Sequence, residues 1–370
     1  MSITHPPPLT RKQDKQGPNV TMNPFDRLGD HFTVRPPTLE DIPALLPMIN
    51  RASIVMQGHT DHTAQQVETE MTWPGHSLEA DERIVLDGDR IVGIIALFHH
   101  ENPPVSVWTW GRVDPDYEGR GIGTALMAWV EQRARQAALP RVPSDIRVVM
   151  HAGASNGYAP AEALFQACGM TCARHFWQMR ILFNGSIQPS ELPEGIALRT
   201  FEPPHDLEPL VHAVRDAFRD HWGHSDTRFE EELADWQHWI ETDPDYDPTK
   251  WWLAMDGEEI AGMALTKSKS GTDERIAYVD TLGVRRPWRR RGLGVALLRH
   301  AFAAWQGAGK DGVDLHVDAS NPSGATRLYE QAGMVVHQQN ANFEKELRAG
   351  RDVTYRESFD GEPLLTPHEL

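Results

Sequence analysis

The sequence contains the same pattern of segments twice, and this duplication limits the fold more than any other feature. Each half opens with a short alternating run that contains an arginine, at residues 32–36 and 196–200. Such a run predicts a strand. Residues 39–49 and 207–218 follow, with apolar side chains three to four positions apart, which predicts a helix in each half. The two halves therefore begin with the same strand and helix.

The later segments match in the same order. An Asp-Gly turn stands between two apolar runs in each half, at Asp87 and Asp256, and predicts a β-hairpin. Each half then continues with a strand, a glycine-rich turn and a long helix, and closes with a strand, a short helix and a Gly-Met turn. Matched positions lie 164 residues apart at Arg35 and Arg199 and 169 apart at the two aspartates. A nearly constant distance predicts two copies of one mixed α/β domain.

The ends of the chain and the segment between the copies have a different composition. Turn-forming residues between the copies predict a linker. The polar, proline-containing start and the polar, acidic end predict segments outside both domains. The predicted organisation is a flexible N-terminal arm (1–30), a first domain (31–185), a linker (186–195), a second domain (196–349) and a tail (350–370).

Charge and composition disfavour several classes of partner. The chain has 36 lysines and arginines against 53 aspartates and glutamates, a formal charge of −17. Nucleic acid and anionic membranes are therefore not expected as partners, because both need a basic surface. No run of about 18 apolar residues predicts a membrane span. The two cysteines, Cys168 and Cys172, fit a reducing, cytoplasmic location. The histidines between 212 and 238 match no common metal-site spacing, so no metal is expected.

A glycine-rich turn between a strand and a helix is the main candidate binding feature of each half. Glycines at alternate positions leave the backbone open to a ligand, and the N–H groups that start the helix attract an anion such as a diphosphate. In the second half, five arginines within seven positions stand beside the turn, a local exception to the acidic charge. The patterns of dinucleotide-binding folds and of P-loop hydrolases are absent. Another polyanionic ligand is expected.

These residues resemble the GNAT N-acetyltransferase superfamily. Its first signature, Arg/Gln-x-x-Gly-x-Gly/Ala between a strand and a helix, matches residues 289–294 in full and residues 118–123 except at the first position. Its second signature resembles residues 321–334. The resemblance covers about 32–185 and 196–348. The double arrangement is similar to tandem acetyltransferases of the mycothiol synthase type.

The resemblance implies a fold and an acyl donor. Each domain would be a central, mostly antiparallel, splayed sheet flanked by helices, and the donor would be acetyl-coenzyme A (acetyl-CoA). The turn would hold the pyrophosphate and the strand before it the pantetheine arm. The second-half residues implied in coenzyme binding are Leu282, Gly283, Val284, Arg289, Arg290, Arg291, Gly292, Leu293, Gly294, Val295, Ala296, Asn321, Ser323 and Arg327. The first-half counterparts are Val113, Arg120, Gly121, Ile122, Gly123 and Thr124.

Two residues of the second half are candidates for the chemistry. Tyr329 stands where the family has the acid that protonates the leaving thiolate; the alternative is a core tyrosine whose hydroxyl caps a backbone group. Asp280 is the best candidate for the base, because a carboxylate on an otherwise apolar strand needs an explanation. It can equally bind the acceptor amine, pair with an arginine or act through a water. Strict alternation would place Asp280 on one face with every second residue from Tyr278 to Val284.

The first half lacks these groups. Phe165 stands in place of Tyr329, and Thr109 is expected in place of Asp280. Glu118 puts a negative charge beside the turn, which weakens anion binding. We therefore expect the first domain to be structural, to shape the acceptor site or to bind coenzyme weakly.

The expected function is transfer of an acetyl group from acetyl-CoA to a primary amine of a small molecule, such as an amino sugar or an amino acid, by direct attack in a ternary complex. One alternative is a decayed acyltransferase pair that senses acyl-CoA without turnover. Another is a protein or peptide N-acetyltransferase, since an acidic surface suits a basic partner. The sequence leaves the acceptor open, and both a monomer and a homodimer are compatible with it.

Overall fold

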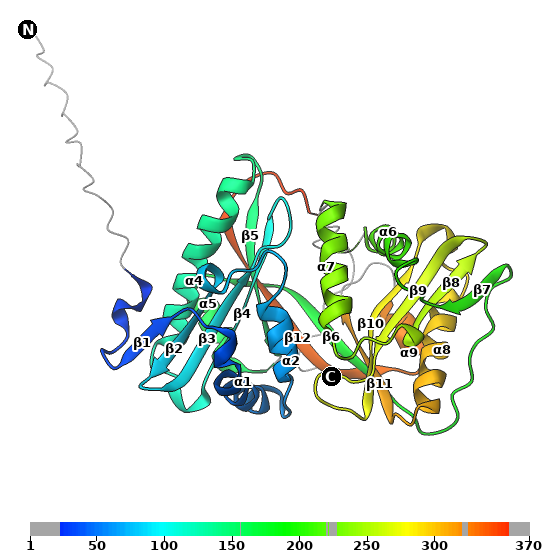
Figure 1. Ribbon diagram of the computed structural model, residues 1–370, viewed down its shortest axis with the longest axis horizontal. Helices are drawn as coiled ribbons and strands as arrows, with labels where there is room; N and C mark the ends of the chain where they lie inside the picture. Colours follow the sequence, from blue (N-terminus) through cyan, green and yellow to red (C-terminus); the bar gives the residue numbers. More distant parts are fainter. Residues whose placement is uncertain (1–22, 156, 220, 222–227, 320–324, 355–370) are drawn as a thin grey trace, which may run out of the picture.

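The computed structural model describes residues 23–155, 157–219, 221, 228–319 and 325–354. In these ranges the chain forms one 12-stranded mixed sheet with helices on both faces (Figure 1). The strand order is β1-β2-β3-β4-β5-β12-β6-β11-β10-β9-β8-β7. The predicted fold class, two mixed α/β units with helices flanking the sheet, is confirmed.

The elements follow the duplicated pattern of the sequence. The strands of the first half are β1 (Phe32–Arg35), β2 (Glu82–Asp87), β3 (Arg90–Phe98), β4 (Ser106–Val113), β5 (Val148–Ser155) and β6 (Thr171–Leu182). Its α-helices are α1 (Ile42–Gln57), α2 (Ala64–Met71), α3 (Leu78–Asp81), α4 (Ile122–Ala138) and α5 (Ala159–Ala167). The strands of the second half are β7 (Ile196–Thr200), β8 (Trp251–Asp256), β9 (Glu259–Lys267), β10 (Ile276–Val284), β11 (Gly312–Asp318) and β12 (Val335–Arg348). Its α-helices are α6 (Leu207–Phe218), α7 (Phe229–Thr242), α8 (Leu293–Gly307) and α9 (Ala325–Gln331).

The two halves exchange their last strands. β6 of the first half pairs with β11 of the second, and β12 of the second half pairs with β5 of the first. The two exchanged strands also pair with each other and cross the middle of the molecule (Figure 1). The predicted domains 31–185 and 196–349 are continuous segments of the chain. In the sheet, however, the last strand of each segment pairs with strands of the other segment. Division into two independent domains therefore stays a prediction.

Each half of the sheet opens where its two parallel strands separate. β4 pairs with β5 only over Ser106–Thr109, and β10 pairs with β11 only over Ile276–Val279. Beyond these pairs, residues 110–113 and 280–284 have no partner on the parallel side. All other neighbours in the sheet are antiparallel. The mostly antiparallel, splayed sheet implied by the family resemblance is thus present in both halves.

A β-bulge in β10 interrupts the alternation of its side chains. Asp280 is an extra residue between Val279 and Thr281, which face consecutive positions of β9. One extra residue shifts every later side chain to the opposite face. Leu282 therefore packs into the same core as Val279 and not on the side of Tyr278. The expectation that alternation continues from Tyr278 through Leu282 is wrong for this reason.

The corresponding strand of the first half has no bulge. When the two hairpins are matched by register, the β3–β4 ladder runs without a shift, and β4 has one residue fewer than β10. Thr109 takes the place of Val279, and Trp108 takes the place of Tyr278. Asp280 has no counterpart, so the expected match of Asp280 with Thr109 is wrong.

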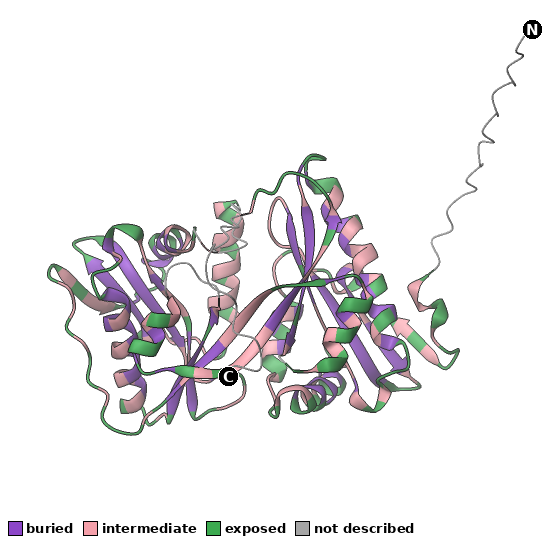
Figure 2. Ribbon diagram, turned by 180° about the vertical axis from the view of Figure 1, so that it is seen from behind, coloured by how far each residue is buried: buried purple, intermediate pink, exposed green. Residues whose placement is uncertain are grey.

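Apolar cores lie on both faces of the sheet. In the first half, α4 packs on one face and α1 on the other; in the second half, α8 and α6 take these places. Figure 2 shows the central strands as the most buried parts of both halves. Because both faces are covered, the free space for ligands lies at the ends of the strands.

The arginine of each opening strand ties that strand to the next helix. Arg35 donates to both carboxylate oxygens of Asp41, at 2.8 and 2.7 Å. Arg199 donates in the same way to Asp206, with the Nη2–Oδ1 distance at 2.8 Å. This bidentate pair explains why the repeated opening run contains an arginine.

Within the described ranges, no helix has both the length and the apolarity to cross a membrane. In the same ranges, no three histidine, cysteine or acidic side chains gather as a metal site would require.

Candidate active site

The second glycine-rich turn leads directly into α8. Gly292 has φ 82° and caps the helix, which begins at Leu293. Arg290 has φ 61° and is the one described residue other than glycine with a positive φ. No side chain caps the start of α8, so its first N–H groups are free for a ligand or for solvent. This is the geometry of an anion site at a helix N-terminus.

The two glycines of the turn have different roles. A Cβ on Gly292 would touch no atom within 4 Å, so this glycine is needed for its left-handed conformation. A Cβ on Gly294 would lie 2.7 Å from the Leu328 side chain, so that glycine lets α8 pack against α9. In the first half Gly123 meets Leu164 at 3.0 Å in the same way. The second glycine thus has a packing role that the sequence did not predict, and its contact with a ligand stays a prediction.

Two of the arginines around this turn are used inside the protein. Arg289 donates to the backbone oxygens of Val284 at 3.0 Å and of Ala217 at 2.8 Å. Arg285 donates to the Asp216 carboxylate at 2.9 Å. These contacts join the end of β10 to α6 and hold the turn in place. The signature arginine, Arg289, therefore has a structural role here.

Two other arginines face solvent beside α8. Arg290 and Arg291 are exposed, and neither pairs with any residue in the part of the chain that the structure describes. Arg327 is exposed on α9. Asn321 and Ser323, implied in coenzyme binding by the resemblance, lie outside the described residues. Arg290 and Arg291, which lie in the turn itself, are thus cations that an anion at α8 can reach.

The strand before the turn offers backbone groups to a ligand. Leu282 and Val284 are half-buried, and neither has a partner on β11. Gly283 is buried, and a Cβ there would lie 2.5 Å from the Met263 sulfur and 3.1 Å from Phe218. Only glycine fits at this position. The opened edge of β10 has the length and the free backbone that an extended arm requires.

The first turn of α8 contributes backbone and not side chains. Leu293 and Ala296 are each 1% exposed and belong to the core under the sheet. Val295 is half-buried between them. Their side chains anchor α8. The N–H groups of Leu293 and Val295 point toward the turn because they are among the first of the helix, whereas the Ala296 N–H already donates to the Gly292 carbonyl at 3.1 Å.

Polar side chains gather where β10 and β11 separate. The Tyr278 hydroxyl lies 2.9 Å from Nδ1 of His316. Asp280 is exposed, and its Oδ1 lies 3.4 Å from the Lys267 ammonium, which also binds Asp243 at 2.9 Å. Burial alone would lower the pKa of Lys267, but the two carboxylates raise it above its usual value, so the lysine stays charged. Asp280 thus has a lysine as its partner.

Tyr329 lies on α9 with its ring in the core beneath β10. It is 8% exposed, and burial raises the pKa of its hydroxyl to about 12. No residue in the described ranges forms a hydrogen bond with this hydroxyl. Burial, and then Asp280, Asp314 and Tyr329, raise the pKa of Tyr278, which places the two tyrosines in one electrostatic environment.

The first half forms the same turn with different chemistry around it. Gly121 has φ 84° and caps α4 as Gly292 caps α8. Glu118, at the signature arginine position, accepts a short hydrogen bond from the Tyr158 hydroxyl. Arg120 lies over the Tyr117 ring, 4.4 Å from its centre. A carboxylate and a tyrosine therefore stand beside the first turn. The second turn has the exposed Arg290 and Arg291 instead.

The end of β4 also differs from the end of β10. Arg112 takes the place of the glycine that precedes Val284; it lies over the Trp110 ring and 3.4 Å from Asp61. Val113 ends the strand, half-buried. A large charged side chain thus stands beside the end of β4 at the position where the second half has Gly283.

The first turn of α4 and the acid position complete the comparison. Ile122 is 1% exposed and Thr124 is exposed, so one anchors the helix and the other faces solvent. Phe165, in place of the tyrosine, packs against Phe343 of the exchanged strand β12. This half has no hydroxyl at the acid position.

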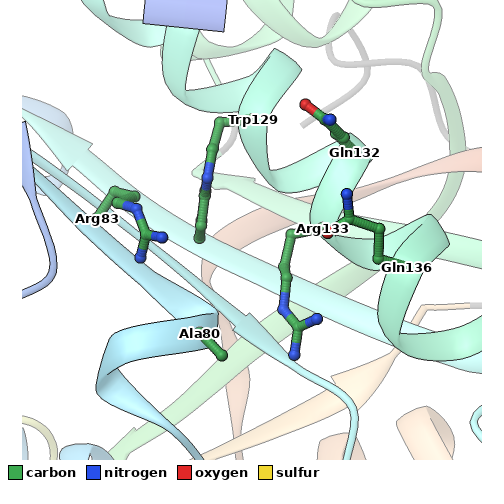
Figure 3. Close-up of a pocket in the computed structure, with 6 residues that line it drawn as sticks. All are labelled: Ala80, Arg83, Trp129, Gln132, Arg133 and Gln136. Carbon is green, nitrogen blue, oxygen red and sulfur yellow. The ribbon is translucent and has the colours of Figure 1, made fainter. Parts of the chain in front are cut away.

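One cavity of ≈ 290 Å³ lies elsewhere, between α3, β2 and the later part of α4 (Figure 3). Its lining residues are Ala80, Arg83, Trp129, Gln132, Arg133 and Gln136. The turn stands at the other end of α4, so this cavity belongs to neither splay.

A splayed mixed sheet with an anion cradle at a helix start defines an acyltransferase of the GNAT type, and the comparisons agree. The model of the acetyltransferase (GNAT) family matches residues 53–170 and 208–334. The chain belongs to this family and is a tandem member of it, with one match in each half.

Individual relatives show which members of the family the chain is similar to. The mycothiol acetyltransferase of Thermobispora bispora is 34% identical over 254 residues, 68% of this chain and 78% of the relative. That of Streptomyces coelicolor is 28% identical over 312 residues, 84% of this chain and 93% of the relative. The chain is thus an acetyltransferase similar to the mycothiol synthase type.

Solved structures give the same fold. A GCN5-related N-acetyltransferase from Sphaerobacter thermophilus superposes with a TM-score of 0.72 at 30% identity, covering 88% of this chain and 98% of that one. A tandem GNAT protein from the clavulanic acid biosynthesis pathway superposes with a TM-score of 0.65 at 15% identity, covering 86% and 100%. The second likeness concerns the fold alone.

Proposed function

We propose that this protein transfers an acetyl group from acetyl-CoA to a primary amine of a small molecule, with the chemistry in its second half. The observation that supports this most is the grouping around one splay. The buried Tyr329, the bulged Asp280 and the α8 cradle with its two free arginines all adjoin the open edge of β10. The first splay has the same glycine-capped helix start, but Phe165 replaces the tyrosine, β4 has no bulge, and Glu118 stands beside the turn.

In this proposal, the second half holds the donor along β10. The first N–H groups of α8 bind the diphosphate, and Arg290 and Arg291 add positive charge beside it. Leu282 and the N–H of Val284 pair with the pantetheine amides at this edge, while the Val284 carbonyl stays bound to Arg289. The thioester then lies near the bulge, because the arm runs from the turn back along the strand.

The protonation roles follow from burial. Tyr329 is kept in its neutral form by burial, so it can donate a proton to a departing thiolate. Asp280 is exposed beside Lys267, and we assign to it the binding of the acceptor's ammonium group. An exposed carboxylate keeps its charge, and opposite charge orients a cationic acceptor.

We propose that the first half does not hold the donor and shapes the acceptor site. Glu118 and Tyr158 bind each other beside the first turn, and Arg112 stands at the end of β4 where the second half has a glycine. Contacts between α2 and α7 bring the first half to the second; Thr69 donates to the Thr242 carbonyl at 3.3 Å. The region next to α7 is thus built by both halves.

The test is acetyl transfer with the intact protein. The names of the relatives make mycothiol without its acetyl group the first acceptor to try, followed by a panel of amino sugars and amino acids. Thiol release from acetyl-CoA, together with a mass gain of one acetyl group on the acceptor, is the expected result. Binding of acetyl-CoA without thiol release over the whole panel would instead identify a sensor. Acetylation of basic peptides alone would identify a protein acetyltransferase.

A further inference from the structure

Tyr278 and His316 form a polar contact that the assigned roles do not use. The Tyr278 hydroxyl lies 2.9 Å from His316 Nδ1, and the two rings are 5.7 Å apart. Tyr278 lies one residue before the bulge. His316 follows Leu315, the last β11 residue that pairs with β10. Both side chains therefore stand at the apex of the splay, where the strands begin to separate.

The direction in which a proton can move depends on the tautomer of His316. When the Tyr278 hydroxyl donates, Nδ1 carries no proton and the neutral ring has its proton on Nε2, which is the form that a relay from Tyr278 to His316 requires. Burial lowers the pKa of His316 despite the opposing effect of Asp314 and Asp280. The pKa of Tyr278 is raised, so its hydroxyl keeps its proton until another replaces it. A neutral imidazole that accepts from an intact phenol can take a proton through it, and His316 is exposed, so it can pass that proton on to solvent.

The surroundings of His316 favour this direction. Asp314 and Asp280 are the acidic groups that act on the ring, and both stabilise an imidazolium once it forms. On the neighbouring strand β6, the residue in register with His316 is Gln178, which is uncharged. Lys267 lies on β9 opposite Tyr278, and its charge is balanced by Asp280 and Asp243.

We propose that Tyr278 and His316 are the proton relay that deprotonates the acceptor amine. This inference rests on the proposed function and assigns the base that it leaves open. The ammonium group held by Asp280 gives a proton to the Tyr278 oxygen while the Tyr278 proton passes to His316 Nδ1. Asp280 is then a binding group and not the base.

The proton balance of the reaction closes with these groups. The free amine forms the new N–C bond as the C–S bond breaks, and the thiolate takes its proton from Tyr329. The amide nitrogen loses its second proton, which restores Tyr329. His316 returns its proton to solvent, so one proton is released per turnover.

The first half shows what the same position looks like without a relay. Trp108 takes the place of Tyr278 and stacks on His151, with ring centres 4.8 Å apart. An indole in this position has no hydroxyl to pass a proton. The relay and the acid Tyr329 thus occur together in the second half and are replaced together in the first.

The first test is the pH dependence of acetyl transfer, measured by thiol release between about pH 5 and 9. Wild-type kcat is expected to fall on the acid side, at a pH below the ordinary histidine value of about 6.5. His316→Gln and Tyr278→Phe should each lower kcat by about 100-fold and remove this acid limb, with the acceptor KM changed less than about twofold. The double variant should be no slower than either single one, because the two groups act as a unit.

Two further variants separate the relay from a structural contact. Asp280→Asn should raise the acceptor KM and keep the acid limb. Trp108→Phe, in the matching position of the first half, should leave the pH profile unchanged. The relay is overturned if His316→Gln and Tyr278→Phe retain wild-type kcat with its acid limb, or if Asp280→Asn alone removes that limb.

A second measurement does not depend on turnover. Nitrogen-15 NMR of the labelled histidine rings should show the His316 proton on Nε2, and Tyr278→Phe should raise the His316 pKa because it removes the donor to the neutral ring. If wild-type protein releases thiol and His316 carries its proton on Nδ1, the relay alone is wrong. If wild-type protein releases no thiol with any amine, the proposed function fails and the relay fails with it.

Discussion

At the scale of single residues, the two halves share a backbone and differ in a few side chains. The αL glycine that starts the long helix is present in both, at Gly121 and Gly292. What changes is the polar group around it: a glutamate bound to a tyrosine in the first half, and free arginines in the second. The backbone provides the cradle, and the side chains decide what enters it.

Tyr329 offers a matched pair of substitutions at this scale. Tyr329→Phe should lower kcat by about 100-fold with little change in the KM for acetyl-CoA, because the ring stays packed and only the acid is lost. Phe165→Tyr, the reciprocal change in the first half, should leave kcat unchanged. Initial rates of thiol release measure both. Full turnover by Tyr329→Phe would show that the leaving thiolate needs no acid from this residue.

The two cap glycines offer a second pair. Alanine in a left-handed conformation costs about 1 kcal/mol, so Gly292→Ala should turn the α8 N–H groups and weaken acetyl-CoA binding about fivefold. Gly121→Ala carries the same backbone cost in the half that we propose not to bind the donor. Titration calorimetry should therefore give one acetyl-CoA per chain and an unchanged affinity for Gly121→Ala. Two equivalents bound by the wild-type protein would contradict this assignment.

At the scale of elements, the sequence predicted most of the architecture. Asp-Gly turns predicted both hairpins, apolar spacing predicted α6 at its observed bounds, and a long helix follows each glycine-rich turn as expected. The bulge in β10 was not predicted, because the residues on both sides of Asp280 are typical of a regular strand. No glycine or proline marks it. Its effect was to move Leu282 to the other face and leave Asp280 without a counterpart.

The pairing of exchanged strands depends on one buried carboxylate. Asp314 on β11 is fully buried and accepts from Arg180 on β6 at 2.6 and 2.7 Å, with Gln178 and Ser270 as further donors. Arg180→Ala leaves this charge without its cation and should lower the free energy of unfolding by about 3 kcal/mol. Arg275→Ala, an exposed arginine, should cost less than about 0.5 kcal/mol. Urea unfolding compares the two, and equal losses would argue against a special role for the buried pair.

The Arg35–Asp41 pair at the first helix predicts a pH effect. The Arg35 guanidinium, opposed by burial and helped by Thr38, lowers the pKa of Asp41 to about 2, below its unfolded value of about 3.9. Its contribution is therefore full above about pH 4 and is lost as the pH falls toward 2. Asp41→Asn should lower the free energy of unfolding by about 1 kcal/mol near neutral pH, because solvent screens this partly exposed pair.

The measurement is urea unfolding of Asp41→Asn and wild type from about pH 7 down to pH 3. The gap between the two should narrow below about pH 4. Asp89→Asn, at an exposed turn, should show no gap at any pH. A gap for Asp41→Asn that stays constant down to pH 3 would mean that the carboxylate charge is not the source of the stability.

At the scale of the whole molecule, no sequence pattern predicts the exchange of β6 and β12. In both copies the last strand follows a strand, a short helix and a Gly-Met turn, so this local pattern does not distinguish pairing within one half from pairing with the other. The exchanged pairing is stabilised by contacts between residues that lie far apart in the chain. Arg147 binds Glu344 and Glu346 of β12, and Lys345 binds Glu131 at 2.6 Å. No local pattern marks such pairs.

The exchanged strands make the peptide bond between the halves dispensable for holding them together. A nick after Pro189, in the exposed linker, would yield two pieces that each carry a strand belonging to the other's sheet. Co-expressed fragments 1–189 and 190–370 should assemble, copurify through a tag on either piece and survive dilution as a reconstituted heterodimer. Fragments that purify separately as folded monomers would contradict this expectation. The paired strands thus hold the two halves together, and the main effect of the linker is to keep them in a one-to-one ratio.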